Sequence, residues 1–380
     1  MRRILTRLPL LVAAGCSCSD QTFVAQTWED NADDYGKWLS MGVSPNGDPV
    51  MAYYDVTAGG VGFAIGDLQS DGAVRWKHEE VDGFADSSGL DPGDLGQFTS
   101  LAVAPDGTTW IAYYARGALK VAHRVDGIWS SEVAASGTGL HPDMGQWASL
   151  ALDGDANPVV AHYDADGGTL QVSRFDGAAW STEEAAVGLP YDGLDAAGAP
   201  VHREANVGMY ANLLIQDSTE YIAYYDAAQQ DLRFLEGFAG AYTASTIYHA
   251  EGGNVGQWPS LWTDGTRIRV AFEDRGNGDL LVAKREGAGS FETDVAVQGD
   301  FAGSDAEIFE RNGAMAVAYF DGRTNDMKLA TEGESGWSAE TLGGADAAVG
   351  FFNEVVTTGG KQFAASYDYT NHTLFWKPLD

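Results

Sequence analysis

Residues 36–55 decide the fold and read GKWLSMGVSPNGDPVMAYYD. A glycine, with an aromatic residue two positions later, opens an apolar strand, and a small-aromatic-aromatic-Asp run ends the next strand. Seven such copies recur along the 380 residues, and successive copies of the second anchor are 47 to 62 residues apart. The opening glycines are Gly36, Gly96, Gly145, Gly208, Gly256, Gly303 and Gly350. A repeat of this period is typical of propellers and related arrays.

Within each copy, glycine and aspartate turns separate four short apolar segments. In the second copy these segments are 97–104, 110–114, 119–124 and 129–133. Four antiparallel strands joined by tight turns make a propeller blade. The sequence therefore predicts an all-β fold, a seven-bladed β-propeller with four antiparallel strands per blade.

The last copy has only three such segments, at 351–356, 362–367 and 373–377. Residues 22–28 read as a strand that has no blade of its own. We predict that 22–28 pairs with 373–377 and closes the last blade, because this removes an open sheet edge. Residues 22–380 then form a single domain.

The first 15 residues have the pattern of an export signal. A basic start precedes an apolar run at 8–14, which is followed by small residues and is too short to span a bilayer. The segment 12–16, VAAGC, resembles the lipobox of bacterial lipoproteins. That resemblance implies cleavage before Cys16 and lipidation of Cys16, and Ser17 implies retention at the outer membrane. We thus expect a signal peptide at 1–15 and a short tether at 16–21.

The amino-acid composition excludes some classes of binding partner. Lys and Arg number 22 against 55 Asp and Glu, a formal net charge of -33. Such acidity argues against nucleic acid and against contact with an anionic membrane other than through the lipid anchor. It fits either solubility outside the cytoplasm or the binding of a divalent cation or a cationic ligand. Cys16 and Cys18 are the only cysteines, which excludes a disulfide within the propeller. We expect a monomer.

Two repeated features are candidates for a binding face. An aspartate follows the second strand in six copies, where it either accepts backbone N–H groups in a turn or contributes to a ring of carboxylates. These are Asp55, Asp164, Asp226, Asp274, Asp321 and Asp368, and Ala115 takes this place in the second copy. An aromatic residue follows each glycine, where it either packs between blades or forms a stacking platform. These are Trp38, Phe98, Trp147, Tyr210, Trp258 and Phe352, with Asp305 as the exception.

Both features are expected on one face, together with the long connections 84–95, 134–144 and 188–207. Long loops on a rigid scaffold often carry binding sites. We expect the contacts of any ligand on this face, with 188–207 either contributing to them or forming an inert loop.

No residue set specifies a reaction. The sequence has no HExxH motif, no G-x-S-x-G elbow and no phosphate-binding loop, so no catalytic residue and no cofactor is predicted. Residues 153–157 and 164–167 space oxygens alternately, as calcium loops do, but lack the distal glutamate and equally fit hairpin turns. The sequence thus leaves open whether the chain binds calcium or another metal ion.

The turns before the fourth strands, at 126–129 (DGIW) and 176–180 (DGAAW), resemble the Asp boxes of sialidase and BNR-repeat proteins, and 333–337 and 237–242 are weaker copies. That resemblance implies a propeller fold. The early F-R-I-P-type motif and the arginine triad of sialidases are not found here.

Three functional interpretations remain. The first, which we favour, is a cell-envelope lipoprotein that acts as a binding or scaffold module for a glycan or an envelope protein. The second is a sialidase-like carbohydrate hydrolase or lyase. The third is a purely structural envelope protein.

Overall fold

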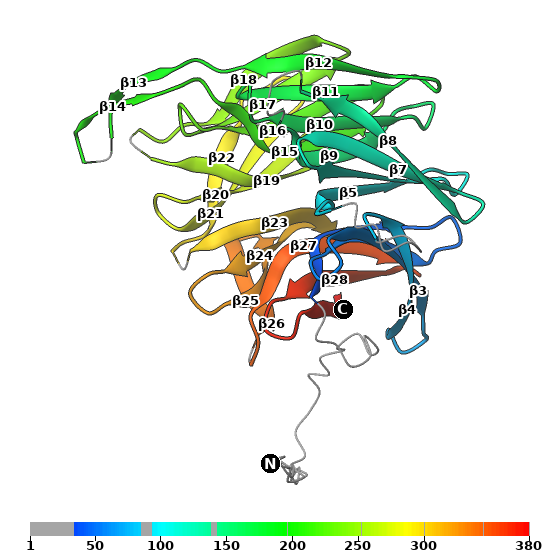
Figure 1. Cartoon of the computed structure of the whole chain (residues 1–380). Helices are drawn as coiled ribbons and strands as arrows, with labels where there is room; N and C mark the ends of the chain where they lie inside the picture. The colour runs from blue at the N-terminus through cyan, green and yellow to red at the C-terminus, as the bar shows by residue number, and fades with distance from the viewer. Residues whose placement is uncertain are drawn as a thin grey trace, which may run out of the picture.

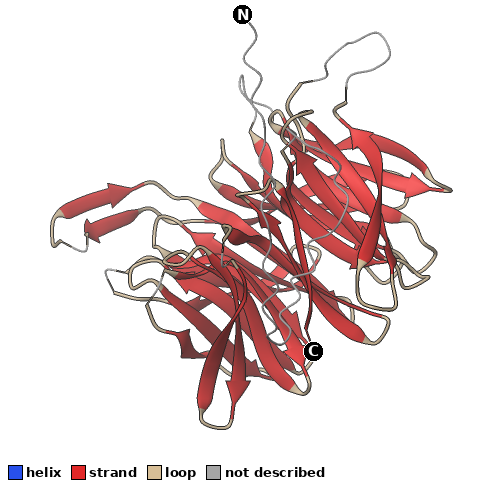
Figure 2. Ribbon diagram, turned by 90° about the horizontal axis from the view of Figure 1, so that it is seen from below, coloured by secondary structure: helices blue, strands red, loops and turns tan. Residues whose placement is uncertain are grey.

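The chain folds into a ring of antiparallel sheets in a computed structural model, which describes residues 34–84, 93–137, 143–195, 197–251, 253–299, 301–344 and 346–379 (Figure 1). These residues form 29 strands and no helix (Figure 2), so none of their elements is a helix that could cross a membrane. Seven sheets make the seven blades, and the two remaining strands form a separate hairpin. The predicted all-β, seven-bladed propeller is confirmed.

The strands of each blade follow one another in sequence. Blade 1 contains β1 (Tyr35–Val43), β2 (Pro49–Asp55), β3 (Gly60–Leu68) and β4 (Val74–Asp82), and blade 2 contains β5 (Gln97–Val103), β6 (Thr109–Ala115), β7 (Ala118–Val125) and β8 (Ile128–Ser136). Blade 3 contains β9 (Met144–Leu152), β10 (Pro158–Asp164), β11 (Thr169–Phe175) and β12 (Trp180–Val187), and blade 4 contains β15 (Val207–Gln216), β16 (Thr219–Asp226), β17 (Asp231–Phe238) and β18 (Ala241–Tyr248). Blade 5 contains β19 (Val255–Thr263), β20 (Arg267–Asp274), β21 (Asp279–Glu286) and β22 (Glu292–Val297), and blade 6 contains β23 (Ala302–Arg311), β24 (Ala314–Asp321), β25 (Asp326–Gly333) and β26 (Gly336–Gly343). Blade 7 contains β27 (Val349–Thr358), β28 (Lys361–Asp368) and β29 (Thr373–Leu379).

The seventh blade shows three strands among the described residues. The predicted closing strand 22–28 lies outside the described residues, as do the predicted signal peptide, the tether and Cys16. The first strands of all seven blades nevertheless contact one another in a closed circle, because β27 also packs against β1.

Apolar side chains stabilise the ring between the blades. The buried residues form seven clusters, and each cluster combines side chains from two neighbouring blades. Phe363 and Trp376 of blade 7, for example, pack with Met41 and Tyr53 of blade 1. The repeated glycines permit this close packing. At Gly256 the φ angle is +98°, and a Cβ atom would lie 2.6 Å from the Leu232 Cβ atom of blade 4.

A circle of polar side chains links the inner strands. Four residues after the repeated glycine, a side-chain oxygen accepts the backbone N–H of the next blade's inner strand. The bonds on this circle are Ser40 with Leu101 at 3.0 Å, Ser100 with Leu150 at 2.9 Å, Ser149 with Leu213 at 2.9 Å, Asn212 with Leu261 at 3.0 Å, Ser260 with Ile308 at 3.0 Å and Glu354 with Met41. Since the last bond joins blade 7 to blade 1, the circle includes the seam between the two ends of the ring.

Tyrosine hydroxyls make a second set of links between the blades. The tyrosine just before the Asp anchor donates to an Asp or Asn two residues before the next blade's glycine. The pairs are Tyr54–Asp94, Tyr114–Asp143, Tyr163–Asn206, Tyr225–Asn254 and Tyr367–Asp34. The last pair again joins blade 7 to blade 1.

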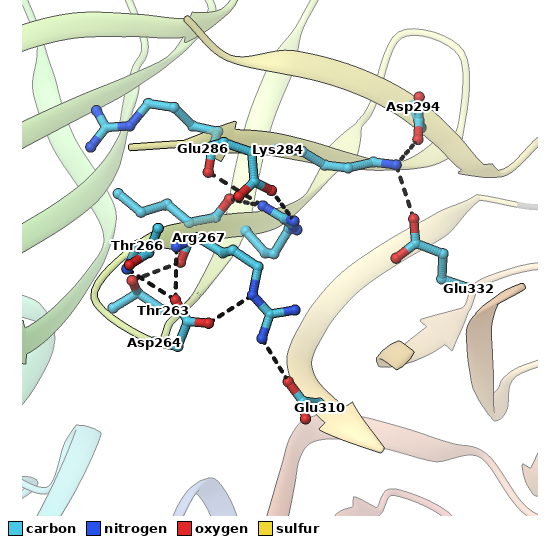
Figure 3. A network of polar contacts seen from close by, with 12 residues as sticks. Thr263, Asp264, Thr266, Arg267, Lys284, Glu286, Asp294, Glu310 and Glu332 are labelled. Atoms are coloured by element: carbon cyan, nitrogen blue, oxygen red, sulfur yellow. Dashed lines mark hydrogen bonds and ion pairs between the residues drawn. The ribbon is translucent and has the colours of Figure 1, made fainter. Parts of the chain in front are cut away.

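Polar contacts between side chains also connect neighbouring blades. Arg267 of blade 5 donates to Asp264 in its own turn, at 2.7 Å, and to Glu310 of blade 6, at 3.0 Å (Figure 3). Lys284 reaches Glu332 of blade 6 at 3.0 Å in the same network. In the turns that resemble Asp boxes, the Trp129 indole donates to Glu79 of the preceding blade, so this tryptophan links neighbouring blades.

Candidate functional site

One face of the ring carries the blade-to-blade connections together with the turns between second and third strands, and we call it the connection face. Backbone hydrogen bonds join the two kinds of segment. Leu95 N–H donates to the Gly59 carbonyl at 3.1 Å, and Val207 N–H donates to the Gly168 carbonyl at 3.0 Å. The prediction that the blade-to-blade connections and the turns between second and third strands lie on one face is therefore confirmed.

At the connection-face end of every inner strand, a bulge interrupts the pairing with the second strand. The pairing shifts twice within the first residues of β1, around Trp38. Trp38 has a φ of 47°, and the equivalent residue of every other blade also lies at positive φ, between 47° and 56°. Such a backbone costs about 1–3 kcal/mol for a bulky residue, and bulges re-aim side chains. Seven repeated bulges thus orient the side chain at the equivalent position of every blade in the same way.

The re-aimed aromatic side chains contact one another in sequence and form a nearly continuous ring, with one side chain from every blade except blade 6. Neighbouring ring centroids are 4.8 to 5.3 Å apart from Phe352 through Trp38, Phe98, Trp147 and Tyr210 to Trp258. All six side chains are half-buried, so each both packs on its neighbours and keeps part of its surface accessible. We call these six residues the aromatic ring. Its gap lies at blade 6, where Asp305 occupies the equivalent position.

Polar groups of blades 5 and 6 surround this gap. Ser304 donates to the Glu273 carboxylate at 3.2 Å, and Arg275 donates to Gln257 at 3.0 Å. Burial, with a further contribution from the charge of Glu273, raises the pKa of Asp305 to about 7, although the Phe352 N–H donates to its carboxylate. Burial also raises the pKa of Glu273, against the opposing effects of Arg275 and Ser304.

Two further carboxyls belong to the polar circle of the inner strands. Glu307 accepts the Ser260 hydroxyl at 2.9 Å, and burial raises its pKa to about 7 against that bond. Burial and the charge of Glu307 raise the pKa of Glu354 well above its usual value. Both side chains keep some accessible surface, yet protein surrounds them on all sides, because the seven inner strands enclose them. A carboxylate enclosed in this way lacks most of its bulk hydration.

The predicted aspartates organise turns. Asp274 accepts the Asn277 N–H at 3.0 Å, and Asp368 accepts the Asn371 N–H at 3.0 Å. Asp55, Asp164, Asp226 and Asp321 accept backbone N–H groups in the same way. Their carboxylates are therefore used by their own turns, as the structural interpretation predicted, whereas their role toward a ligand stays a prediction.

The two calcium-like segments are also turns. Asp153 accepts the N–H groups of Asp155 and Asn157, both at 2.9 Å, and Asp164 accepts that of Asp166 at 3.1 Å. In the described parts of the chain, no group of three His, Cys, Asp or Glu side chains could hold a metal ion.

The long connection between blades 3 and 4 forms a projecting hairpin, β13 (Tyr191–Leu194) with β14 (Pro200–Arg203) (Figure 1). Arg203 stacks on Tyr191, with 4.5 Å from its guanidinium carbon to the ring centroid, and donates to the Ala228 carbonyl of blade 4 at 2.7 Å. His202 lies between Asp192 and Glu204, whose hydrogen bonds raise its pKa. The segment is thus an ordered arm beside the connection face.

No protein-family model matches the chain, and no curated protein is similar to it in sequence. Among solved structures, the polysaccharide lyase Uly1 is 9% identical with a TM-score of 0.58, over 96% of this chain and 94% of that one. A protein from Lactobacillus plantarum is 15% identical with a TM-score of 0.50, over 80% and 83%. A neuraminidase-like protein from A/bat/Guatemala/164/2009 is 10% identical with a TM-score of 0.50, over 75% and 90%. At these identities the likenesses show the propeller fold alone.

Proposed function

We propose that this protein is a glycan-binding module and that the aromatic ring is its contact surface. The observation that carries the proposal is the ring itself, in which strained bulges hold six half-buried aromatic side chains side by side at the connection face. A sugar ring presents a face of C–H groups that packs well on such a platform, while its hydroxyls need polar partners at the edge. Asp305 and Arg275 supply such partners at the gap.

The location proposed for this module is the outer membrane. We propose that Cys16 carries the lipid anchor and that the propeller recognises glycans of the cell envelope. One of the similar structures is named as a polysaccharide lyase, and a polysaccharide ligand for this chain agrees with that name.

A glycan array tests the proposal. The purified chain without its signal peptide should bind at least one class of glycan, and Trp147→Ala or Trp258→Ala should weaken that binding at least tenfold. Phe238→Ala is the matched control, because Phe238 is 57% exposed at the end of β17, on the face opposite the connection face. Binding that survives both ring substitutions, or that is lost in the control, would contradict the proposal.

The raised pKa values support a second candidate, a carbohydrate hydrolase or lyase. A carboxyl with a pKa of about 7, such as that of Asp305 or Glu307, is partly protonated at neutral pH and is suited to general acid catalysis. The wild-type protein should then release cleavage products from the glycans found on the array. The substitutions Asp305→Asn and Glu307→Gln should each abolish this release. Binding without product release would leave the binding module as the better description.

A further inference from the structure

The gap in the aromatic ring is the place where the seven copies differ most in chemistry. Glu273 stands where five blades have the linking tyrosine, and Asp305 stands where six blades have an aromatic residue. Glu307 and Glu354 replace the Ser or Asn that the other five blades place on the polar circle. In a repeat fold, local departures that the scaffold does not require mark functional positions. All four departures introduce a carboxyl group.

These carboxyls belong to blades 5, 6 and 7 and form two pairs, one at the gap and one on the polar circle. The charge of Glu273 acts on Asp305, and the charge of Glu307 acts on Glu354. Arg275 is the cation whose charge acts on Glu273, and it is already bound to Gln257. The gap therefore holds more carboxyls than cations, and it gains negative charge as the pH rises through 7.

A second observation points to a missing donor. Asn353 is only 7% exposed, and its amide nitrogen donates to the Asp305 backbone carbonyl at 2.9 Å, which places this side chain at the gap. Its Oδ1 atom is buried and has no hydrogen-bond partner among the described residues. A buried acceptor without a donor is costly, and a ligand that brings N–H groups would satisfy it.

Aromatic side chains flank the gap on both sides. Tyr210 and Trp258 are in contact on one side, at 4.8 Å between centroids, and Phe352 and Trp38 are in contact on the other, at 5.3 Å. The faces of such rings attract organic cations, Trp most strongly. Carboxylates and aromatic faces together recognise an ammonium group that is attached to a ring-shaped body.

We propose that the gap at Asp305 is a subsite for the protonated amine of an amino sugar. The sugar ring packs on Trp258 or Phe352, its ammonium group faces Asp305 and Glu273, and Asn353 accepts one of its N–H groups. This inference rests on the proposed glycan-binding function and names the sugar class that the site selects. The net charge of -33 favours the approach of such a cationic ligand.

The test compares two ligands that differ only at the amine. Glucosamine hexamer carries free ammonium groups, and N-acetylglucosamine hexamer of the same length carries neutral amides. Isothermal titration at pH 7, where about half of the Asp305 carboxyls are ionised in the free protein, should show at least tenfold tighter binding of the glucosamine hexamer. Asp305→Asn should reduce that preference to less than about twofold, because binding of the glucosamine hexamer weakens more than binding of the acetylated hexamer. Asp305→Phe, which restores the aromatic residue of the other blades, should remove the preference as well.

Asp166→Asn is the matched control, since Asp166 is an exposed carboxylate near the connection face whose loss removes the same charge outside the gap. It should leave both affinities unchanged. Melting curves establish that each variant is folded, and the two different substitutions at Asp305 keep the test valid if one of them is not.

Four results would overturn the inference in distinguishable ways. Equal binding of both hexamers would reject the ammonium subsite and leave glycan binding intact. Binding of neither hexamer, with another glycan bound on the array, would reject the amino sugar alone. An array with no bound glycan would reject the proposed function, and the subsite with it. A preference that Asp166→Asn removes as strongly as Asp305→Asn would show that overall charge is responsible.

Discussion

Replacing Glu307 and Glu354 together by serine should change how the stability of the propeller depends on pH. Serine is the residue at the equivalent position of blades 1, 2, 3 and 5, where its hydroxyl accepts the N–H of the neighbouring inner strand. The double substitution therefore keeps a hydrogen-bond acceptor on the polar circle and removes only the two carboxyls.

The sign follows from the raised pKa values. Between the usual glutamate pKa of 4.5 and the folded value of about 7 for Glu307, the folded state binds more protons than the unfolded state. The stabilising contribution of Glu307 is therefore fully present below pH 4.5 and is lost as the pH rises through 7. At about 1.4 kcal/mol per pH unit between the two pKa values, Glu307 alone accounts for a loss of about 3 kcal/mol. Glu354, whose pKa is also raised, shifts in the same direction.

Thermal unfolding at pH 5.5 and pH 8.5 measures the effect. Glu307 loses about 2 of these 3 kcal/mol between pH 5.5 and pH 8.5, since only about 1.5 pH units of the interval between the two pKa values lie in that range. An entropy of unfolding of about 2 cal/mol/K per residue converts this loss into a fall in Tm of about 2.5 °C for a chain of this size. The fall should be smaller by about that amount in the double variant. Exposed Glu251 and Glu292, replaced together by serine, form the control, which removes two carboxyls without touching the channel. If the double variant and the wild type lose the same Tm between the two pH values, the carboxyls are not held protonated and the reasoning is wrong.

Three further predictions concern the ends of the chain and the seam. Cys16→Ala should release the protein from the membrane fraction, and mass spectrometry of the wild type should show an acylated N-terminal cysteine; a soluble wild type that begins elsewhere would rule out the anchor. Deletion of 22–28 should expose a strand edge on blade 7 and cause aggregation, measured by light scattering, and unchanged solubility would argue against the predicted closure. Tyr367→Phe should lower the free energy of unfolding by about 1–3 kcal/mol, because Asp34 loses a buried donor at the seam, and denaturant titration without a change in midpoint would contradict this.

The repeat made the architecture predictable, because each copy carries its own strand and turn signals. The expected strand 97–104, for example, corresponds to β5 (Gln97–Val103). The projecting hairpin was not predicted, since strands of four residues are too short to show a clear periodicity.

The candidate site was predicted only in part. The aromatic residues were found from their spacing, but spacing cannot decide whether a side chain packs, lines a channel or does both, as these do. Asp305 was recognised only as an exception, and Glu273, Glu307 and Glu354 were missed. Comparison of the seven copies position by position would have singled out all four. Their proximity depends on the packing of neighbouring blades, which at the seam also brings Asp34 beside Tyr367 across almost the whole chain.

The bulge that places one side chain per blade at the channel mouth has a consequence for how binding specificity can change. The backbone at that position is the same whether it carries Trp, Phe, Tyr or Asp, with φ between 47° and 56° throughout. The frame thus offers seven equivalent slots whose contents are interchangeable, while the turns, glycines and polar circle that support them remain fixed. A library that varies only these seven codons should yield proteins with new ligand preferences that keep the same fold.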